Sequence, residues 1–316
     1  MGGARGRIVL VTGGSGFMGA NLTRRLVQEG ARVHLLVRPG SNLARLTGIV
    51  DSVSLHFAEL LDFASVRTTL GKVRPSWVFH LAAKGGHPST PEERLEALRC
   101  SFLGTANLLE AVREVGVSRF IHTGSSLEYG RLPRPAREQD ALRPHTARGI
   151  AKAAASTLVL FYARAYAVPA VILRPFSVYG PWEPPGRLIP TLLRAAFSGE
   201  EVPLTAPGFR HDFVFVEDVV EACLRLAAAR IRPGDSFNVG TGKQWTNEDV
   251  AALVEALTGR TLRLQIGARP PSPPDTSCWV ASVEKLQRRL GWRPQWDLPA
   301  GLRATLDWML AHEPAR

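Results

Sequence analysis

A glycine-rich turn near the start of the chain limits the folds that this sequence can adopt. The apolar run 8–11 is followed by Gly13, Gly16 and Gly19, and residues 20–29 then show helical periodicity. The first glycine allows a turn too tight for a Cβ, the second lets a pyrophosphate approach the backbone, and the third lets the helix pack close to the strand. The helix N-terminus adds N–H groups and the positive end of a dipole. A strand, this turn and a helix in that order predict a dinucleotide-binding site.

The first half of the chain alternates short β-rich runs with helical patterns, as parallel βαβ units do. We therefore expect an α/β fold with a doubly wound parallel sheet in residues 1–176, to which residues 209–240 return. A smaller, proline-rich substrate-binding part is expected from residues 177–208 and 241–316. Strands are expected at 8–11, 32–37, 53–57, 77–82, 119–123 and 170–173. Helices are expected at 20–29, 64–70, 94–115, 149–165, 188–197, 217–229, 247–257, 282–290 and 298–311.

Charge and cysteine content narrow the classes of function. The 316 residues carry 39 basic and 28 acidic side chains, a net charge of +11. The basic residues are mostly arginines scattered singly, which favours anionic ligands and argues against a nucleic-acid-binding arm. The three cysteines have no close pairing, so we expect a reduced compartment and no metal site. Without a signal-peptide pattern or a membrane-length apolar stretch, we expect a cytoplasmic protein that binds neither membrane nor nucleic acid.

Further short motifs occur in the order typical of one protein family. They are 12–19, 80–83, 104–111, 124–130 (Gly-Ser-Ser-Leu-Glu-Tyr-Gly), Lys152, 174–181, 212–219, 237–242 and 290–292. In these residues the chain resembles the extended short-chain dehydrogenase/reductase family, specifically its nucleotide-sugar epimerases, dehydratases and ketoreductases. The resemblance implies a Rossmann fold and a hydride passed between a nicotinamide and a carbon of a bound sugar.

Three positions depart from the pattern of this family. Ser125 and Lys152 match the serine and lysine, but the position four residues before the lysine, where the family has a tyrosine, is Arg148. Arginine stays charged at any working pH and cannot act as the acid. Its positive charge is expected to make Lys152 harder to protonate. Ser101 also stands where the family usually has an asparagine, and His211, preceded by Arg210, stands where it usually has an arginine.

Three accounts of Arg148 stay open. In one account, redox chemistry is lost and the chain only binds a nucleotide or nucleotide sugar. In another, Arg148 binds an anionic substrate group, such as a carboxylate, through two parallel hydrogen bonds. Alternatively, another group supplies the proton, and the candidates are Tyr179, His145, Lys84, Glu128 or Ser125 relaying to water.

The resemblance also implies which residues bind the cofactor. The second expected strand ends at Arg38 with no carboxylate, which favours NADP(H), with NAD as the alternative. The cofactor-binding residues are expected to be Gly13, Gly16, Phe17, Met18, Gly19, Arg38, Glu59, Leu60, Leu81, Ala82, Ala83, Lys152, Pro175 and Val178.

The two residues after Ser125 narrow the reaction. The family's dehydratases carry an Asp-Glu pair there, whereas this chain has Ser126 and Leu127. The resemblance therefore favours 4-keto reduction of a nucleoside diphosphate deoxysugar. C4 epimerisation, or a catalytically impaired binding protein, are the alternatives. Substrate-binding residues are expected to be Lys84, His87, Ser126, Ser177, Arg210, His211 and Asp275, and a homodimer is expected to form through the helices at 94–115 and 149–165.

Three further residues are expected to be structural despite their chemistry. His80 ends an apolar run and is interpreted as a hydrogen-bonded core histidine. Asp212 and Asp218 flank another apolar run and are interpreted in the same way.

Overall fold

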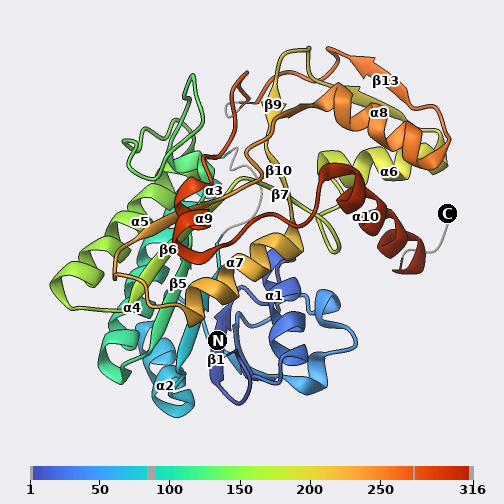
Figure 1. The fold of residues 1–316 in the computed structure, drawn as a ribbon. Helices are drawn as coiled ribbons and strands as arrows, with labels where there is room; N and C mark the ends of the chain where they lie inside the picture. Colours follow the sequence, from blue (N-terminus) through green and yellow to red (C-terminus); the bar gives the residue numbers. More distant parts are fainter. Residues whose placement is uncertain (1–2, 84–89, 273–274, 313–316) are drawn as a thin grey trace. The chain divides into compact units, whose positions relative to one another are not determined.

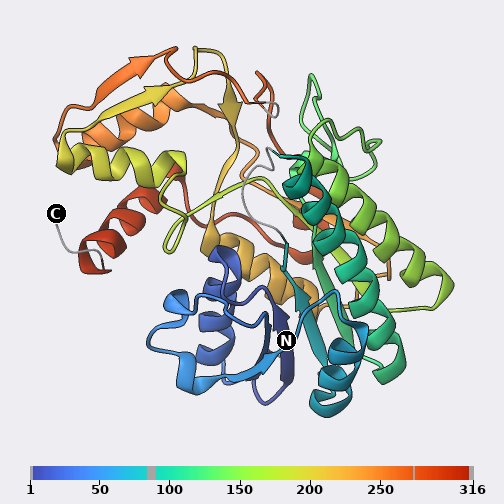
Figure 2. The same ribbon diagram turned by 180° about the vertical axis from the view of Figure 1, so that it is seen from behind.

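The computed structural model describes residues 3–83, 90–272 and 275–312 (Figures 1 and 2). The chain divides into two compact units. The first comprises residues 1–130, 141–174 and 220–237, and the second comprises 131–140, 175–219 and 238–316. The returning segment was expected at 209–240, and the corresponding part of the first unit spans residues 220–237, while the short stretch 131–140 groups with the second unit.

A seven-stranded sheet forms the centre of the first unit, in the order β11-β6-β5-β4-β1-β2-β3. The five pairings among β1 to β6 are all parallel. Strand order reverses between β1 and β4, and in such sheets ligands bind outside the carboxyl ends at this point. The strands are β1 (Ile8–Thr12), β2 (Arg32–Val37), β3 (Ser54–Phe57), β4 (Trp77–His80), β5 (Arg119–Thr123), β6 (Ala170–Pro175) and β11 (Ser236–Val239), the last running into the second unit. The expected doubly wound α/β fold is confirmed.

Helices cover both faces of this sheet (Figure 1). One face packs against α2 (Phe63–Val73), α4 (Gly104–Val115) and α5 (Ala147–Ala165) through a continuous apolar cluster. On the other face lie α1 (Phe17–Gln28) and the adjoining part of α7 (Val216–Ala228), which an ion pair between Arg25 and Glu221 joins at 3.2 Å.

The helix expected at 94–115 is interrupted. The structure has α3 (Pro91–Leu98), a π turn (Arg99–Leu103) and then α4. The first of these begins early because Thr90 and Glu93 form a capping box and Pro91 occupies the first turn.

The second unit packs three helices around its own apolar core. These are α6 (Leu188–Ser198), α8 (Asn247–Thr258) and α10 (Leu298–His312), and α9 (Glu284–Leu290) precedes the last of them along the chain. Three two-stranded sheets complete the unit: β7 (Ser177–Tyr179) with β10 (Phe213–Phe215), β8 (Glu201–Leu204) with β13 (Arg263–Ile266), and β9 (Arg210–His211) with β12 (Trp245–Thr246). No described helix is long and apolar enough to span a membrane.

Candidate functional site

The turn after β1 brings two strand ends and one helix together. Gly13 has φ +74°, and a Cβ there would lie 2.6 Å from the backbone nitrogen of Ala82 and 2.8 Å from the carbonyl carbon of Leu81. A Cβ on Gly19 would overlap the carbonyl oxygen of Gly13. Because side chains are excluded at these positions, the turn packs directly against the backbone that follows β4 and against the first turn of α1.

The N-terminus of α1 is suited to an anion. Gly16 is its N-cap, no described side chain caps it, and its first turn has no acidic residue. The early N–H groups of this helix, including those of Phe17 and Met18, have no partner within the helix. Together with the helix dipole they favour a phosphate group. The glycine cradle and these donors fit the pyrophosphate of a dinucleotide.

The residues expected at the adenosine end lie after β2 and β3. Arg38 is exposed, and its carbonyl accepts from Ser41 N–H at 3.1 Å, which forms a tight turn. Glu59 is exposed, whereas Leu60 is half-buried and its carbonyl accepts from the side-chain amide of Asn107 at 2.8 Å. These positions agree with the expected placement at the carboxyl edge of the sheet, and their role in binding stays a prediction.

Glu128 forms a buried ion pair and does not present a proton to the site. Its side chain is fully buried, and Oε2 accepts from Arg174 Nε at 2.7 Å. Oε1 accepts from the backbone N–H of Ser125 at 2.8 Å and from the hydroxyl of Ser156 at 3.0 Å. Burial raises the pKa of Glu128. The prediction that Glu128 donates a proton is therefore wrong, because its carboxylate is buried and ion-paired. Its hydrogen bonds order the turn that carries Ser125. The sequence pattern gave Arg174 and Ser156 no role.

Lys152 lies beneath this turn. Its ammonium Nζ donates to the carbonyl of Thr123, the last residue of β5, at 2.6 Å, and the residue is only 4% exposed. Burial lowers the pKa of Lys152 to about 8, and the positive charge of Arg148 acts in the same direction. The expected effect of Arg148 on this lysine is confirmed in direction.

His80 is a core residue, as expected. Its Nδ1 lies 2.6 Å from the hydroxyl of Thr12, and its Nε2 lies 2.9 Å from the hydroxyl of Thr105. Burial lowers the pKa of His80 to about 3, so the ring is neutral. It links β4 to β1 and to α4.

Tyr179 occupies the core of the second unit. The residue is 1% exposed, and its hydroxyl donates to the carbonyl of Leu298 at 3.4 Å. A Cβ on Gly301 would overlap this hydroxyl, and Phe215 packs against the ring. Burial raises the pKa of Tyr179. The hypothesis that Tyr179 replaces the missing tyrosine is therefore wrong, because its hydroxyl is enclosed by protein.

Three of the expected substrate residues lie together in the second unit. The backbone N–H of Arg210 donates to the carbonyl of Thr276 at 3.0 Å, which places β9 beside the loop of Asp275. Burial lowers the pKa of His211, and the charge of Asp275 opposes that shift. Asp275 accepts from the backbone N–H of Ser272 at 2.7 Å, so part of its role is to order its own loop.

The remaining expected residues divide between the units. Pro175 and Val178 are buried and Ser177 is half-buried in the second unit, whereas Ser126 is buried in the first. Ala83 is exposed after β4. Lys84 and His87 lie outside the described residues.

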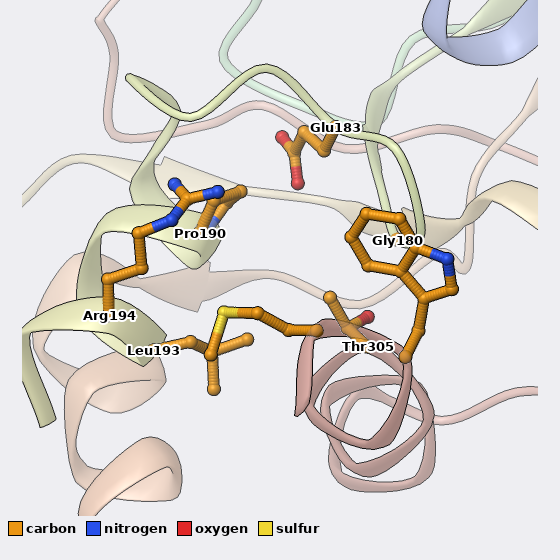
Figure 3. A pocket seen from close by; sticks show the side chains of 8 residues that line it. Gly180, Glu183, Pro190, Leu193, Arg194 and Thr305 are labelled. Atoms are coloured by element: carbon orange, nitrogen blue, oxygen red, sulfur yellow. The ribbon is translucent and has the colours of Figure 1, made fainter. Parts of the chain in front are cut away.

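A small cavity in the second unit holds a residue that the sequence pattern did not single out. Figure 3 shows the carboxyl group of Glu183 pointing into the space between Pro190 and Thr305. The cavity measures about 10 Å³, the scale of one water molecule and too small for a sugar. Oε1 of Glu183 lies 3.4 Å from Arg187 Nε, and Oε2 has no partner among the described residues. The lining residues are Gly180, Glu183, Pro190, Leu193, Arg194, Thr305, Trp308 and Met309.

Replacing Glu183 with glutamine is expected to stabilise the protein at high pH only. Burial raises the pKa of Glu183 from 4.5 to about 7. The protonated form is compatible with folding, and stability is lost as pH rises from the unfolded pKa through the folded one. The change that Glu183→Gln makes to the free energy of unfolding should therefore be more stabilising at pH 8 than at pH 4.5, by roughly 2–3 kcal/mol. Urea unfolding at both pH values measures this, with the exposed Glu200→Gln as control. Equal effects at both pH values would contradict the expectation.

Comparisons with known proteins place this geometry in a family. The sequence model of the NAD dependent epimerase/dehydratase family matches residues 9–240. The chain belongs to this family. It is similar to a dTDP-glucose 4,6-dehydratase of Xanthomonas campestris pv. campestris, at 29% identity over 96% of this chain and 93% of the relative. It is also similar to a dTDP-4-dehydro-6-deoxy-D-allose reductase of Streptomyces sp., at 31% identity over 98% of each chain.

A solved epimerase shares the fold. The structure of Thermus thermophilus UDP-glucose 4-epimerase in complex with NAD is similar with a TM-score of 0.86 and 30% identity, over 95% of this chain and 98% of that one. A dehydratase, a reductase and an epimerase thus resemble this chain along nearly its whole length.

Proposed function

We propose that this member of the epimerase/dehydratase family is an NAD(P)-dependent oxidoreductase that reduces the 4-keto group of a nucleoside diphosphate deoxysugar. The observation that carries the proposal is the cradle at Gly13 and Gly19, which opens on the uncapped N-terminus of α1. This arrangement supports binding of a pyrophosphate at the carboxyl edge of the parallel sheet.

Reduction is favoured over elimination by the residues after Ser125. The family's dehydratases need an acid and a base there, whereas this chain has Ser126 and Leu127. The similarity to a dTDP-sugar reductase over nearly the whole chain supports the same choice. Reduction also differs from C4 epimerisation in consuming its reduced cofactor.

The proposed cofactor is NADP(H). No carboxylate stands at the end of β2 to accept from the ribose hydroxyls, and exposed Arg38 follows that strand with a cationic side chain suited to a 2′-phosphate. The remaining proposed cofactor contacts are those expected from the sequence. A bound reduced nicotinamide would supply a hydride to the sugar.

The protein's own residues would orient the sugar and its diphosphate. Ser125 Oγ accepts from Leu127 N–H at 3.2 Å, which leaves its hydroxyl proton to donate to the ketone oxygen. In the second unit, Arg210 is proposed to contact the diphosphate, with His211 and Asp275 beside it.

The test is a spectrophotometric assay with a 4-keto-6-deoxy nucleotide sugar and NADPH or NADH. Loss of absorbance at the reduced-nicotinamide band, faster with NADPH, supports the reductase. A change of sugar configuration without net cofactor consumption would instead identify an epimerase. Tight NADP binding by calorimetry with no turnover would identify a binding protein.

The chain is further proposed to form a homodimer through its first unit. Exposed apolar side chains lie on the π turn and on α5, among them Phe102, Ile150 and Phe161. The double variant Ile150→Glu and Phe161→Glu is expected to shift the protein from dimer to monomer, because charges in an apolar interface would be desolvated. Sedimentation velocity measures this, with exposed Leu310→Glu on α10 as control. A monomeric unmodified protein would contradict the proposal.

A further inference from the structure

Arg148 and Lys152 form a pair of cations on one side of α5. They are four residues apart, one helical turn, so their side chains lie on the same face. The ammonium group of Lys152 is held at the last residue of β5 by the carbonyl of Thr123, two residues before Ser125. A proton-bearing group therefore lies at the carboxyl edge of the sheet, where the chain continues into the turn that carries Ser125.

The titratable groups around Lys152 come from four elements. Arg148 comes from α5 and Glu128 from the turn after β5, and these two act on the lysine in opposite directions. His80 on β4 and His122 on β5 are both buried, and burial lowers their pKa values, so both rings are neutral near pH 7.

The carboxylate of Glu128 would favour the charged form of Lys152, but it is already hydrogen-bonded to other groups. Both carboxylate oxygens of Glu128 accept hydrogen bonds, one of them from the guanidinium of Arg174 on β6. Burial and Arg148 thus dominate, and the pKa of Lys152 falls to about 8. An acid with a pKa near the working pH is protonated for a useful fraction of time and also releases its proton readily.

Three other residues are less suitable as donors. Tyr179 is enclosed in the core of the second unit, Glu128 is ion-paired, and Arg148 keeps its proton at any working pH. We propose that Lys152 gives its proton to the substrate's ketone oxygen, and that Arg148 is a positioning residue that keeps this lysine ready to release it. This inference rests on the proposed reductase function and names the acid that replaces the absent tyrosine.

The step balances without a further reactant. As the ketone carbon gains hydride from the reduced cofactor, a C–H bond forms and the π pair of the C=O bond moves to oxygen. That oxygen takes a proton from Nζ of Lys152, so an N–H bond breaks, an O–H bond forms and the lysine is left as a neutral amine. The sugar is reduced and the cofactor oxidised. The amine then regains a proton from solvent.

The charge arrangement can be tested without turnover. The chain has only five lysines, at 72, 84, 152, 243 and 285, so ¹³C-lysine NMR gives few signals to follow with pH. One signal is expected to titrate near pH 8 and to be absent in Lys152→Arg but present in Lys243→Arg, a control at an exposed site. In Arg148→Met the midpoint should rise by roughly one pH unit, because a nearby positive charge is removed. A Lys152 signal at the ordinary lysine pKa, or one unmoved in Arg148→Met, would overturn the inference.

The second arm follows the pH dependence of ketone reduction. Because the protonated lysine is the active form, kcat should fall as pH rises through about 8. Arg148→Met should move this limb upward by the same amount as the NMR midpoint, and charge-retaining Arg148→Lys should restore it. Lys152→Met should lose roughly 10²- to 10⁴-fold in kcat at saturating cofactor.

The two proposals fail in different ways. If the protein reduces the ketone but the pH dependence of kcat is unchanged in Arg148→Met and in Lys152→Met, the role of Lys152 is contradicted. The proposed reductase function is not affected by that result. A shifted lysine signal without any reduction of 4-keto sugars contradicts the proposed function, and the proton assignment fails with it.

Discussion

Gly19→Ala should weaken NADP binding by at least about 100-fold, or roughly 2.7 kcal/mol. A Cβ at this position would overlap the carbonyl oxygen of Gly13, which belongs to backbone and cannot rotate away. The turn must open to relieve the overlap, and the N-terminus of α1 then moves away from the phosphates that it is proposed to bind. Isothermal titration calorimetry measures the loss.

A matched substitution separates this effect from a general effect of alanine. Gly71 lies within α2, and a Cβ there would meet no atom within 4 Å. Gly71→Ala should therefore leave binding unchanged and stabilise the fold by up to about 1 kcal/mol. Circular dichroism checks that both variants are folded. Undiminished NADP binding by folded Gly19→Ala would show that the turn is not the pyrophosphate site.

Arg174→Met should be the most destabilising of the substitutions considered, by roughly 3–5 kcal/mol. It leaves the carboxylate of Glu128 fully buried without its cation. The loss should be largest at high pH and smaller at low pH, because protonation of Glu128 removes the unpaired charge. Urea unfolding at pH 8 and pH 5 measures both effects at fixed protein concentration.

Two companion variants test the cause. Arg134→Met removes a pair with Asp140, at 2.8 Å, whose arginine side chain is half exposed, and should cost less than about 1 kcal/mol. The double variant Arg174→Met and Glu128→Leu should recover part of the loss, since no charge stays buried. It cannot recover all of it, because Ser125 N–H and the Ser156 hydroxyl lose their acceptor. If Arg174→Met alone lowers the free energy of unfolding no more than Arg134→Met does, the proposed contribution of the Arg174–Glu128 ion pair is contradicted.

The sequence predicts the first unit well because its elements carry strong local signals. The strands Arg32–Val37 and Arg119–Thr123 begin and end where expected, since each is a β-rich run in a βαβ unit. The short strands of the second unit were not predicted. β9 and β12 have two residues each, too few to show alternation, and their pairing depends on contacts between distant segments.

The candidate site was less predictable because partners matter more than residue types. The sequence indicates that Glu128 and Tyr179 could donate a proton, yet an ion pair engages one and apolar packing encloses the other. The structural interpretation of Asp212 was correct, since its carboxylate accepts from the backbone N–H groups of Thr241, Gly242 and Ala281. The effect of Arg148 on Lys152 was foreseeable because helical spacing alone sets their proximity.

The hydrogen-bonded bridge from Thr12 through the imidazole of His80 to Thr105 affects how the pH dependence of this protein is interpreted. The ring takes up a proton only near pH 3, so the bridge keeps one protonation state across the range in which enzymes are assayed. The ends of β1 and β4 are consequently joined by a group that does not titrate in that pH range. A change in rate between pH 6 and pH 9 therefore does not come from titration of this bridge.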